Sequence, residues 1–126
     1  DYVHIAVGEE VVIGDNVLIG SKVLISDLNH GTYGGAEAHC NPNTPPDNRP
    51  INTKPVFIGN NVWIGDNVCI LKGVKIGNGC VIGANSVINK NIQDNCIVAG
   101  TPMKIIKKYN TNINRWEKIN YESSNE

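Results

Sequence analysis

The chain has 126 residues, the size of one domain, with 11 basic and 12 acidic side chains, a net charge of −1 and a pI of about 6.3. This balance argues against a nucleic-acid partner, and the absence of a run of 18 apolar residues argues against membrane insertion. No secretory leader is visible. The first residue is aspartate, inside a repeat-like stretch, which leaves open whether residues precede it in the full protein.

From residue 7 the sequence repeats with a period of six. The first position is aliphatic in all ten hexads, the second is glycine in seven, and the fifth is small or branched in most. Repetition at a short fixed period predicts a solenoid and outweighs strand prediction in single windows. The hexads begin at Val7, Ile13, Ile19, Ile25, Ile58, Ile64, Ile70, Ile76, Ile82 and Ile88.

The composition of the hexad predicts an all-β fold of short stacked strands. The aliphatic first position and the small fifth position would face inward, whereas Gly, Asn and Asp between them tolerate the backbone angles of a sharp corner. One hexad buries too little to be stable alone, so stacking must create the core. An antiparallel sandwich, the alternative, does not explain ten segments in phase.

The repeat is interrupted between two of these hexads. Ile25 and Ile58 are 33 residues apart, which is not a multiple of six. The intervening loop, residues 26–56, is rich in proline and glycine and contains His30 and His39. A long loop in a compact solenoid is usually functional or disordered, and its prolines indicate a stiff segment that holds a position.

Two segments of the sequence carry a resemblance to a known family. The run IGNNVWIGDNVCILKGVKIGNGCVIGANSVINKNI (residues 58–92), followed by AGTPMKII (residues 99–106), resembles the hexapeptide-repeat acyltransferases. The resemblance extends from Val7 to about Lys108 and implies a left-handed parallel β-helix with three hexads per coil. The motif NHGTY, with PPDNRP downstream, is most similar to the bacterial polysaccharide O-acetyltransferases.

This resemblance implies transfer of an acetyl group from acetyl-CoA to a sugar hydroxyl of a surface polysaccharide or its precursor. The register of the repeat places His30 where the family has its catalytic base. Imidazole suits this role because its unperturbed pKa, about 6.5, allows proton uptake near neutral pH. Asp27 and Glu37 are both candidates to orient the ring. The predicted acceptor contacts are Asn29, Tyr33, His39 and Trp63. His39 either touches the acceptor or faces water, and Trp63 either lines the acetyl or acceptor end of the tunnel, as the resemblance implies, or packs against the loop.

The family binds coenzyme A in a groove between coils, largely through backbone amides, and meets its phosphates with basic residues. Trp63 should project outward, and a backbone amide near Asp66 is a candidate oxyanion donor by family analogy. The residues that match the coenzyme site are Asp66, Gly83, Ala84, Asn89, Lys90, Lys104 and Lys107.

Other functions stay open at this stage. Within the fold they are N-acetylation of an amino-sugar nucleotide and O-acetylation of serine or a xenobiotic; a structural β-helix module is the non-enzyme alternative. A zinc site of the γ-carbonic anhydrase kind is disfavoured, because the gaps between His4, His30 and His39 do not fit stacked coils. No metal is expected, and His4 is expected on the surface.

The organisation expected from these observations is a β-helix domain over residues 1–108, with residues 26–56 inserted, followed by a helix and tail over residues 109–126. Ile106, Tyr109, Ile113 and Trp116 recur at three- and four-residue spacing, which predicts a short amphipathic helix. From Ser123 the tail should be frayed. The family resemblance implies a homotrimer with active sites between subunits, and the unpaired cysteines favour the cytoplasm.

Overall fold

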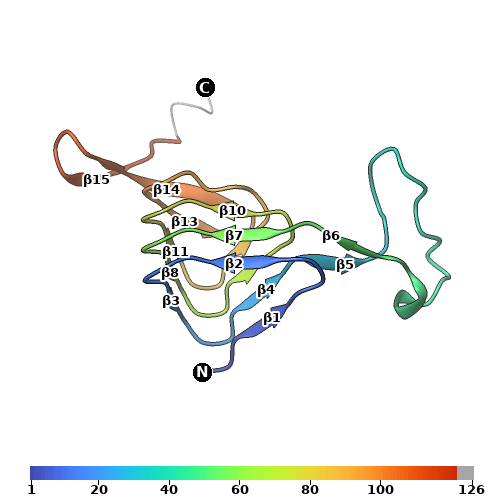
Figure 1. The fold of residues 1–126 in the computed structure, drawn as a ribbon. Helices are drawn as coiled ribbons and strands as arrows, with labels where there is room; N and C mark the ends of the chain where they lie inside the picture. Colours follow the sequence, from blue (N-terminus) through green and yellow to red (C-terminus); the bar gives the residue numbers. More distant parts are fainter. Residues whose placement is uncertain (122–126) are drawn as a thin grey trace.

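The computed structural model describes residues 1–121 and shows a three-sided parallel β-helix (Figure 1). Sheet A contains β1 (His4–Ala6), β4 (Leu24–Ser26), β9 (Cys69–Ile70) and β12 (Val87–Ile88). Sheet B contains β2 (Val11–Ile13), β7 (Val56–Ile58) and β10 (Lys75–Ile76). Sheet C contains β3 (Leu18–Ile19), β8 (Trp63–Ile64), β11 (Val81–Ile82), β13 (Cys96–Gly100), β14 (Met103–Asn110) and β15 (Arg115–Lys118). The fold is the left-handed parallel β-helix that the repeat and the resemblance predicted; the tail from Ser123 lies outside the described residues.

The corners between the sheets explain the Gly, Asn and Asp of the repeat. The fourth residue of the hexad takes a positive φ in coil after coil, a conformation that Gly and Asn adopt at low cost. Seven residues at this position have φ between 57° and 79°: Asn16, Lys22, Asn61, Asn67, Gly73, Gly79 and Asn85.

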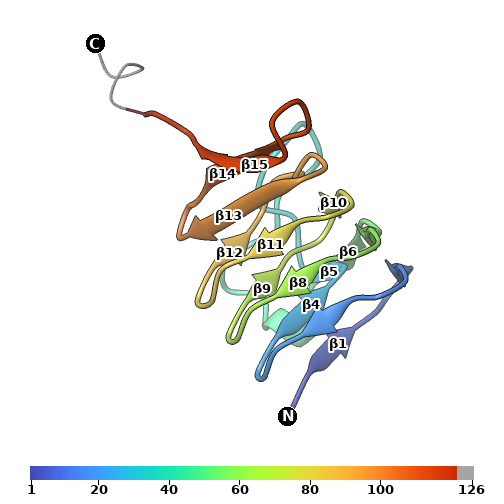
Figure 2. The ribbon, with the colours of Figure 1, turned by 90° about the vertical axis from the view of Figure 1, so that its left-hand side faces the viewer.

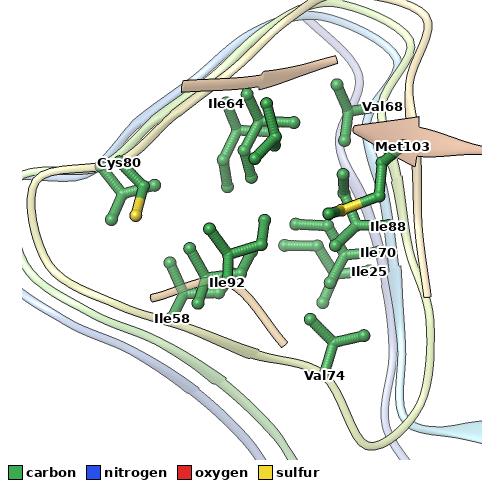
Figure 3. Packing of buried hydrophobic residues seen from close by; sticks show 14 of the residues in the cluster. Ile25, Ile58, Ile64, Val68, Ile70, Val74, Cys80, Ile88, Ile92 and Met103 are labelled. Atoms are coloured by element: carbon green, nitrogen blue, oxygen red, sulfur yellow. The ribbon is translucent and has the colours of Figure 1, made fainter. Parts of the chain in front are cut away.

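Stacked aliphatic side chains form the core, as predicted from the first and fifth hexad positions. Ile25, Ile70 and Ile88 lie above one another along the inner side of sheet A, and each is 0% exposed (Figure 3). At the N-terminal end the first coil covers the core incompletely, so Ile13 and Ile19 remain partly exposed. The helical axis is therefore filled by hydrocarbon, which leaves the outer faces and corners for ligands.

The prediction of a C-terminal helix is wrong. Residues 103–118 form the antiparallel hairpin β14–β15, which adds to the last coil through pairing of β13 with β14 (Figure 2). The edge of β13 offers unpaired backbone groups, and a strand satisfies them where a helix would not. The apolar spacing instead reflects cross-strand contact, because the rings of Tyr109 and Trp116 meet edge to face at 5.3 Å.

We call the three-sided stack of coils the prism. The inserted segment, residues 27–55, leaves the prism at the corner between sheets A and B and is here called the arm (Figure 1). It starts with β5 (Leu28–His30) and returns with β6 (Ile51–Thr53), after the 3₁₀-helix η1 (Pro46–Asn48). β5 and β6 pair antiparallel, so a two-stranded ribbon carries the tip of the arm away from the coils.

Candidate active site

Hydrogen bonds between coils run along the corner that joins sheets B and C. At the third hexad position, each backbone N–H donates to the side-chain oxygen of the Asn or Asp at the same position one coil further on. The N–H of Asp15 donates to Asn60 Oδ1 at 2.7 Å, that of Asn60 to Asn78 Oδ1 at 2.7 Å, and that of Asn78 to Asp94 Oδ1 at 2.8 Å. We call this series the corner ladder.

The equivalent ladder at the corner between sheets C and A stops after one step. The N–H of Ser21 donates to Asp66 Oδ1 at 2.8 Å. On the next coil the third position is Ala84, which has no side-chain oxygen. Within residues 1–121, neither the N–H of Asp66 nor the N–H of Ala84 has a hydrogen-bond acceptor. Two main-chain donors are therefore free at this corner.

These two donors lie in a groove of about 260 Å³ on the outer side of sheet C. The indole of Trp63 is 54% exposed and projects outward, as predicted. A Cβ at Gly65 would lie 2.8 Å from the Ala84 nitrogen, so the missing side chain keeps that N–H accessible. The groove is lined by Trp63, Gly65, Asp66, Val81, Ile82, Gly83 and Ala84.

Basic residues lie beyond the groove, on the C-terminal hairpin that extends sheet C. Lys104 and Lys107 lie on β14, opposite Ala99 and Ile97 of β13. β13 is the strand next to β11, so the two lysines are two strands away from β11 in sheet C. The structure adds Lys118, which pairs directly with Lys107 across β14 and β15. Like charges in this position repel, and a bound anion would relieve the repulsion. Lys118 was not predicted from the sequence, because a helix was expected in this segment.

The remaining residues predicted to bind coenzyme lie elsewhere. Asn89 and Lys90 follow β12 and occupy the corner between sheets A and B, whereas Asp66 occupies the corner between sheets C and A. One chain thus brings Asp66, Gly83 and Ala84 together but leaves Asn89 and Lys90 at a different corner.

His30 ends β5 on the arm and is exposed. Within the described part of the chain, no side chain or carbonyl accepts a hydrogen bond from its ring. Its backbone carbonyl accepts one from the hydroxyl of Tyr33. The arm points away from the prism, and no arm residue lines the Trp63 groove (Figure 1). A single chain therefore separates the predicted base from the groove.

Of the two candidates to orient His30, Asp27 has a different task. Its carboxylate is 0% exposed and accepts the backbone N–H groups of Gly8, Glu9 and Glu10 at 2.7–2.8 Å. Burial raises the pKa of the Asp27 carboxyl, but the three donors lower it by more, so its pKa lies below the ordinary value. Asp27 thus fixes the start of the arm to the first coil.

Arg49 fixes the tip of the arm. Its guanidinium donates to the carbonyls of Thr44 and Pro42 and, at 2.8 Å, to the hydroxyl of Tyr33. His39 is exposed, with Nε2 3.2 Å from the carbonyl oxygen of Gly35. The arm is therefore held by its own hydrogen bonds.

His4 is exposed on β1, as expected, and the three histidines lie on separate elements. Within residues 1–121, no three His, Cys, Asp or Glu side chains lie together as a metal site would require. The same residues contain no helix long and apolar enough to cross a membrane.

Comparison with known proteins agrees with the fold. Residues 55–90 match the family "Bacterial transferase hexapeptide (six repeats)", and residues 10–31 match "Hexapeptide repeat of succinyl-transferase". The chain is 52% identical over 118 residues to the putative lipopolysaccharide biosynthesis O-acetyl transferase WbbJ of Escherichia coli K12, covering 94% of this chain and 60% of that protein.

Two solved structures show the same architecture. A galactoside acetyltransferase in complex with coenzyme A superposes with a TM-score of 0.74 and 34% identity, covering 94% of this chain and 56% of that one. A hexapeptide-repeat acetyltransferase of Vibrio cholerae, complexed with acetyl coenzyme A, gives 0.70 and 33%, covering 84% and 53%.

The stacked hexads form a left-handed parallel β-helix, the fold of the hexapeptide-repeat acetyltransferases. The chain belongs to the hexapeptide-repeat family of bacterial transferases. It spans about 60% of the length of its curated relative and just over half of the two solved structures.

Proposed function

We propose that this protein is an acetyl-CoA-dependent O-acetyltransferase that modifies a sugar hydroxyl of a surface polysaccharide or its precursor. The observation that carries the proposal is the interruption at Ala84 of the equivalent ladder between sheets C and A, which leaves two main-chain donors free in a groove. The 52% identity to a putative lipopolysaccharide O-acetyl transferase supports the sugar acceptor. We also propose that the protein acts in the cytoplasm, which is consistent with such a biosynthetic role.

The groove residues fit a coenzyme A molecule. Its amide-bearing arm would take a hydrogen bond from the free N–H group of Ala84, and its phosphates would face Lys104, Lys107 and Lys118. When bound, acetyl-CoA supplies an acetyl group activated as a thioester. The N–H of Asp66 is then a donor for the charge that develops on the acetyl oxygen, a contribution of roughly 10²–10³ in rate.

His30 acts as the general base in this proposal. It accepts the proton of the sugar hydroxyl as the hydroxyl attacks the acetyl carbon directly, without a covalent acetyl-enzyme. The proton then passes to the leaving thiolate of coenzyme A as the C–S bond of the thioester breaks. General-base help of this kind is worth roughly 10²–10⁴ in rate. Because the arm carries His30 away from its own groove, the base is supplied to the groove of a neighbouring subunit. We therefore propose a homotrimer whose active sites lie between subunits, as closed cyclic symmetry allows.

Thiol release from acetyl-CoA, measured with a panel of sugars, amino sugars and polysaccharides, tests the activity. His30→Ala should lower kcat/KM by about a hundredfold or more and leave coenzyme binding intact. His4→Ala is the matched control, since His4 is exposed on β1, and it should keep wild-type turnover. Equal turnover by His30→Ala and wild type would remove His30 as the base, and turnover of amino sugars alone would replace O- by N-acetylation.

Mixed oligomers test the location of the site. His30→Ala chains lack the base, and Ala84→Asn chains should lack an open groove. If each site combines the base of one chain with the groove of the next, unfolding and refolding the two inactive variants together should restore about a quarter of wild-type activity, since half the chains supply each part. No recovery in mixed trimers confirmed by mass would place both parts in one chain.

A further inference from the structure

A second and larger cleft lies where the arm joins the prism, away from the Trp63 groove. Its volume is about 470 Å³. It lies between the ribbon of the arm and the corner that follows β9. The cleft is lined by Asn29, Gly31, Thr32, Tyr33, Gly34, Glu37, Asn52, Thr53, Lys54 and Lys72.

One lining residue of this cleft, Asn29, has a buried polar atom without a partner. Asn29 and Asn52 pair across β5 and β6, and both side-chain amides donate to the carbonyl of Gly31, at 3.0 and 2.6 Å. These contacts set the orientation of the Asn29 amide, so its Oδ1 is an acceptor; this atom is buried without a donor. A buried acceptor without a donor is costly, and a ligand hydroxyl would satisfy it.

Two cations lie in the same cleft. The stem of Lys54 passes over Gly73, where a Cβ would be only 2.6 Å from Lys54 Cδ, so the absence of a side chain there gives Lys54 its path. Lys72 lies at the adjacent corner. Among the described residues neither ammonium group has an ion-pair partner. Glu37 is the one carboxylate in the lining, which leaves a surplus of one positive charge.

The cleft and the catalytic base lie on opposite sides of the arm. Successive residues of a strand point to opposite faces, so Asn29 faces the cleft and His30 faces away from it. His30 accordingly does not line the cleft. A ligand held there is not the reacting group itself but lies on the other side of the ribbon from it.

We propose that this cleft binds an anionic sugar unit of the acceptor glycan. The anionic group is held by Lys54 and Lys72, a sugar hydroxyl donates to Asn29 Oδ1, and a second hydroxyl donates to Glu37. The hydroxyl that is acetylated lies on another part of the same acceptor, which passes around the ribbon to His30. This inference rests on the proposed function and specifies its substrate class: a glycan or glycan precursor with a phosphate or carboxylate near the acetylated residue.

Binding of three monosaccharides to the whole chain tests the proposal, because they share a ring and differ in charge. Glucose 1-phosphate, glucuronic acid and glucose are titrated at low salt without coenzyme, and the side-chain amide NMR signals of Asn29 and Asn52 are followed. At least one anion should bind about tenfold more tightly than glucose and shift both signals. A preference for glucose 1-phosphate identifies a phosphate-linked acceptor, and a preference for glucuronic acid identifies an acidic sugar. Equal binding of all three would overturn the proposal.

Variants locate the charge recognition. Lys54→Gln and Lys72→Gln should each weaken the preferred anion about tenfold and leave glucose binding unchanged. Lys75→Gln is the matched control: its ammonium lies 5.6 Å from the Phe57 ring on sheet B, outside the cleft. Asn29→Leu should weaken the anion and glucose alike, and Asn52 still satisfies the Gly31 carbonyl in that variant. Unchanged anion binding in both lysine variants would overturn the proposal.

The acetylation assay separates this proposal from the proposed function. In an active enzyme, the lysine variants should raise KM for an anionic acceptor about tenfold with kcat unchanged. If the enzyme turns over but KM is the same for charged and neutral acceptors and is unchanged in both lysine variants, this proposal would be overturned. The proposed acetyltransferase activity would still stand. Lysine-dependent anion binding without turnover of any acceptor would support the cleft and overturn the activity.

Discussion

The corner between sheets B and C and the corner between sheets C and A have the same backbone design but different chemistry. Both place a glycine at the second hexad position and a residue of positive φ at the fourth. At the first corner, three consecutive N–H groups are satisfied by Asn or Asp oxygens. At the second, the series ends at Asp66, because the next coil has Ala84.

This difference shows how a structural repeat becomes a binding site. Unpaired main-chain N–H groups cost stability where they are buried, but at the open corner they are exposed to a groove and to a ligand. One missing side-chain amide is sufficient to convert an inter-coil hydrogen bond into a donor that faces outward. The two corners therefore distinguish residues that hold coils together from residues that are proposed to bind coenzyme A. Each prediction below changes a residue of one of these two groups.

Completing the ladder at the second corner should have the largest effect. In Ala84→Asn, the new Oδ1 should accept the N–H of Asp66. The space for this oxygen exists, because Gly65 is equivalent to Gly59, whose absent Cβ would lie 2.5 Å from Asn78 Oδ1. We expect kcat/KM to fall about a hundredfold through loss of the donor, with the thermal midpoint equal to or above that of wild type.

Coenzyme titration and thermal unfolding of the same Ala84→Asn sample decide the outcome. Ala84→Ser, whose shorter side chain reaches less far toward Asp66, serves as control and should lose less activity. Wild-type activity in Ala84→Asn, with the new hydrogen bond seen in a crystal structure, would show that the free N–H of Asp66 has no part in the reaction.

The third corner, between sheets A and B, has a stronger form of the same contact. Here Asp27 accepts three N–H groups on the ionised carboxylate, and its pKa is lowered. Stability from this contact is present above the ordinary carboxyl pKa and is lost as pH falls through the lowered value in the folded state. We expect the wild-type unfolding midpoint to fall below about pH 4.

Asp27→Asn removes this charge and should cause the largest loss of stability among these variants at neutral pH, because an amide presents N–H groups to the same donors. The difference in unfolding midpoint between wild type and Asp27→Asn should shrink as pH falls from 6 to 3, as measured by circular dichroism. A difference that stays constant with pH would show that the carboxylate charge contributes nothing at this corner.

Lys118, on β15, belongs to the residues proposed to bind coenzyme A together with those of the second corner. Lys118→Gln should weaken coenzyme A binding by up to about tenfold at low salt, and less as salt screens the charge. Without coenzyme, the same variant should be slightly more stable, because its repulsion from Lys107 is removed. Lys108→Gln is the control, since Lys108 lies next to Lys107 in β14 but pairs with Glu117. Calorimetric titration of both variants measures the contrast.

The repeat made the coils predictable from sequence. Period six, inward aliphatic residues and Asn or Gly at the corners each have one physical meaning in a stacked solenoid, and the buried Ile column and positive-φ corners confirm them. The C-terminal segment was mispredicted because three- and four-residue spacing does not distinguish a helix from strands over so short a stretch. The segment forms a strand because it pairs with the edge of β13. Pairing to an existing edge is a tertiary effect that local pattern does not contain.

The candidate site was predictable in part, for the same reason. Asp66 and Ala84 fall together because both are the third residue of a hexad and lie one coil apart, and Gly83 directly precedes Ala84. Asn89 and Lys90 follow β12 and lie at another corner. The arm has no period, so neither the task of Asp27 nor the cleft with Lys54 and Lys72 follows from sequence; both depend on how β5 and β6 leave the prism.

The smallest predicted effect is the converse of Ala84→Asn. Asn78→Ala removes an acceptor from the intact ladder and frees the N–H of Asn60, which donates to it at 2.7 Å. One neutral hydrogen bond contributes about 1 kcal/mol, so the free energy of unfolding should fall by that amount in urea titration, while kcat/KM should stay within about twofold of wild type. The natural Ala84 and the alanine introduced in Asn78→Ala then occupy the same hexad position at two different corners. If Asn78→Ala instead lowered activity without loss of stability, the first corner would also bind ligand, and the distinction between the two ladders would not hold.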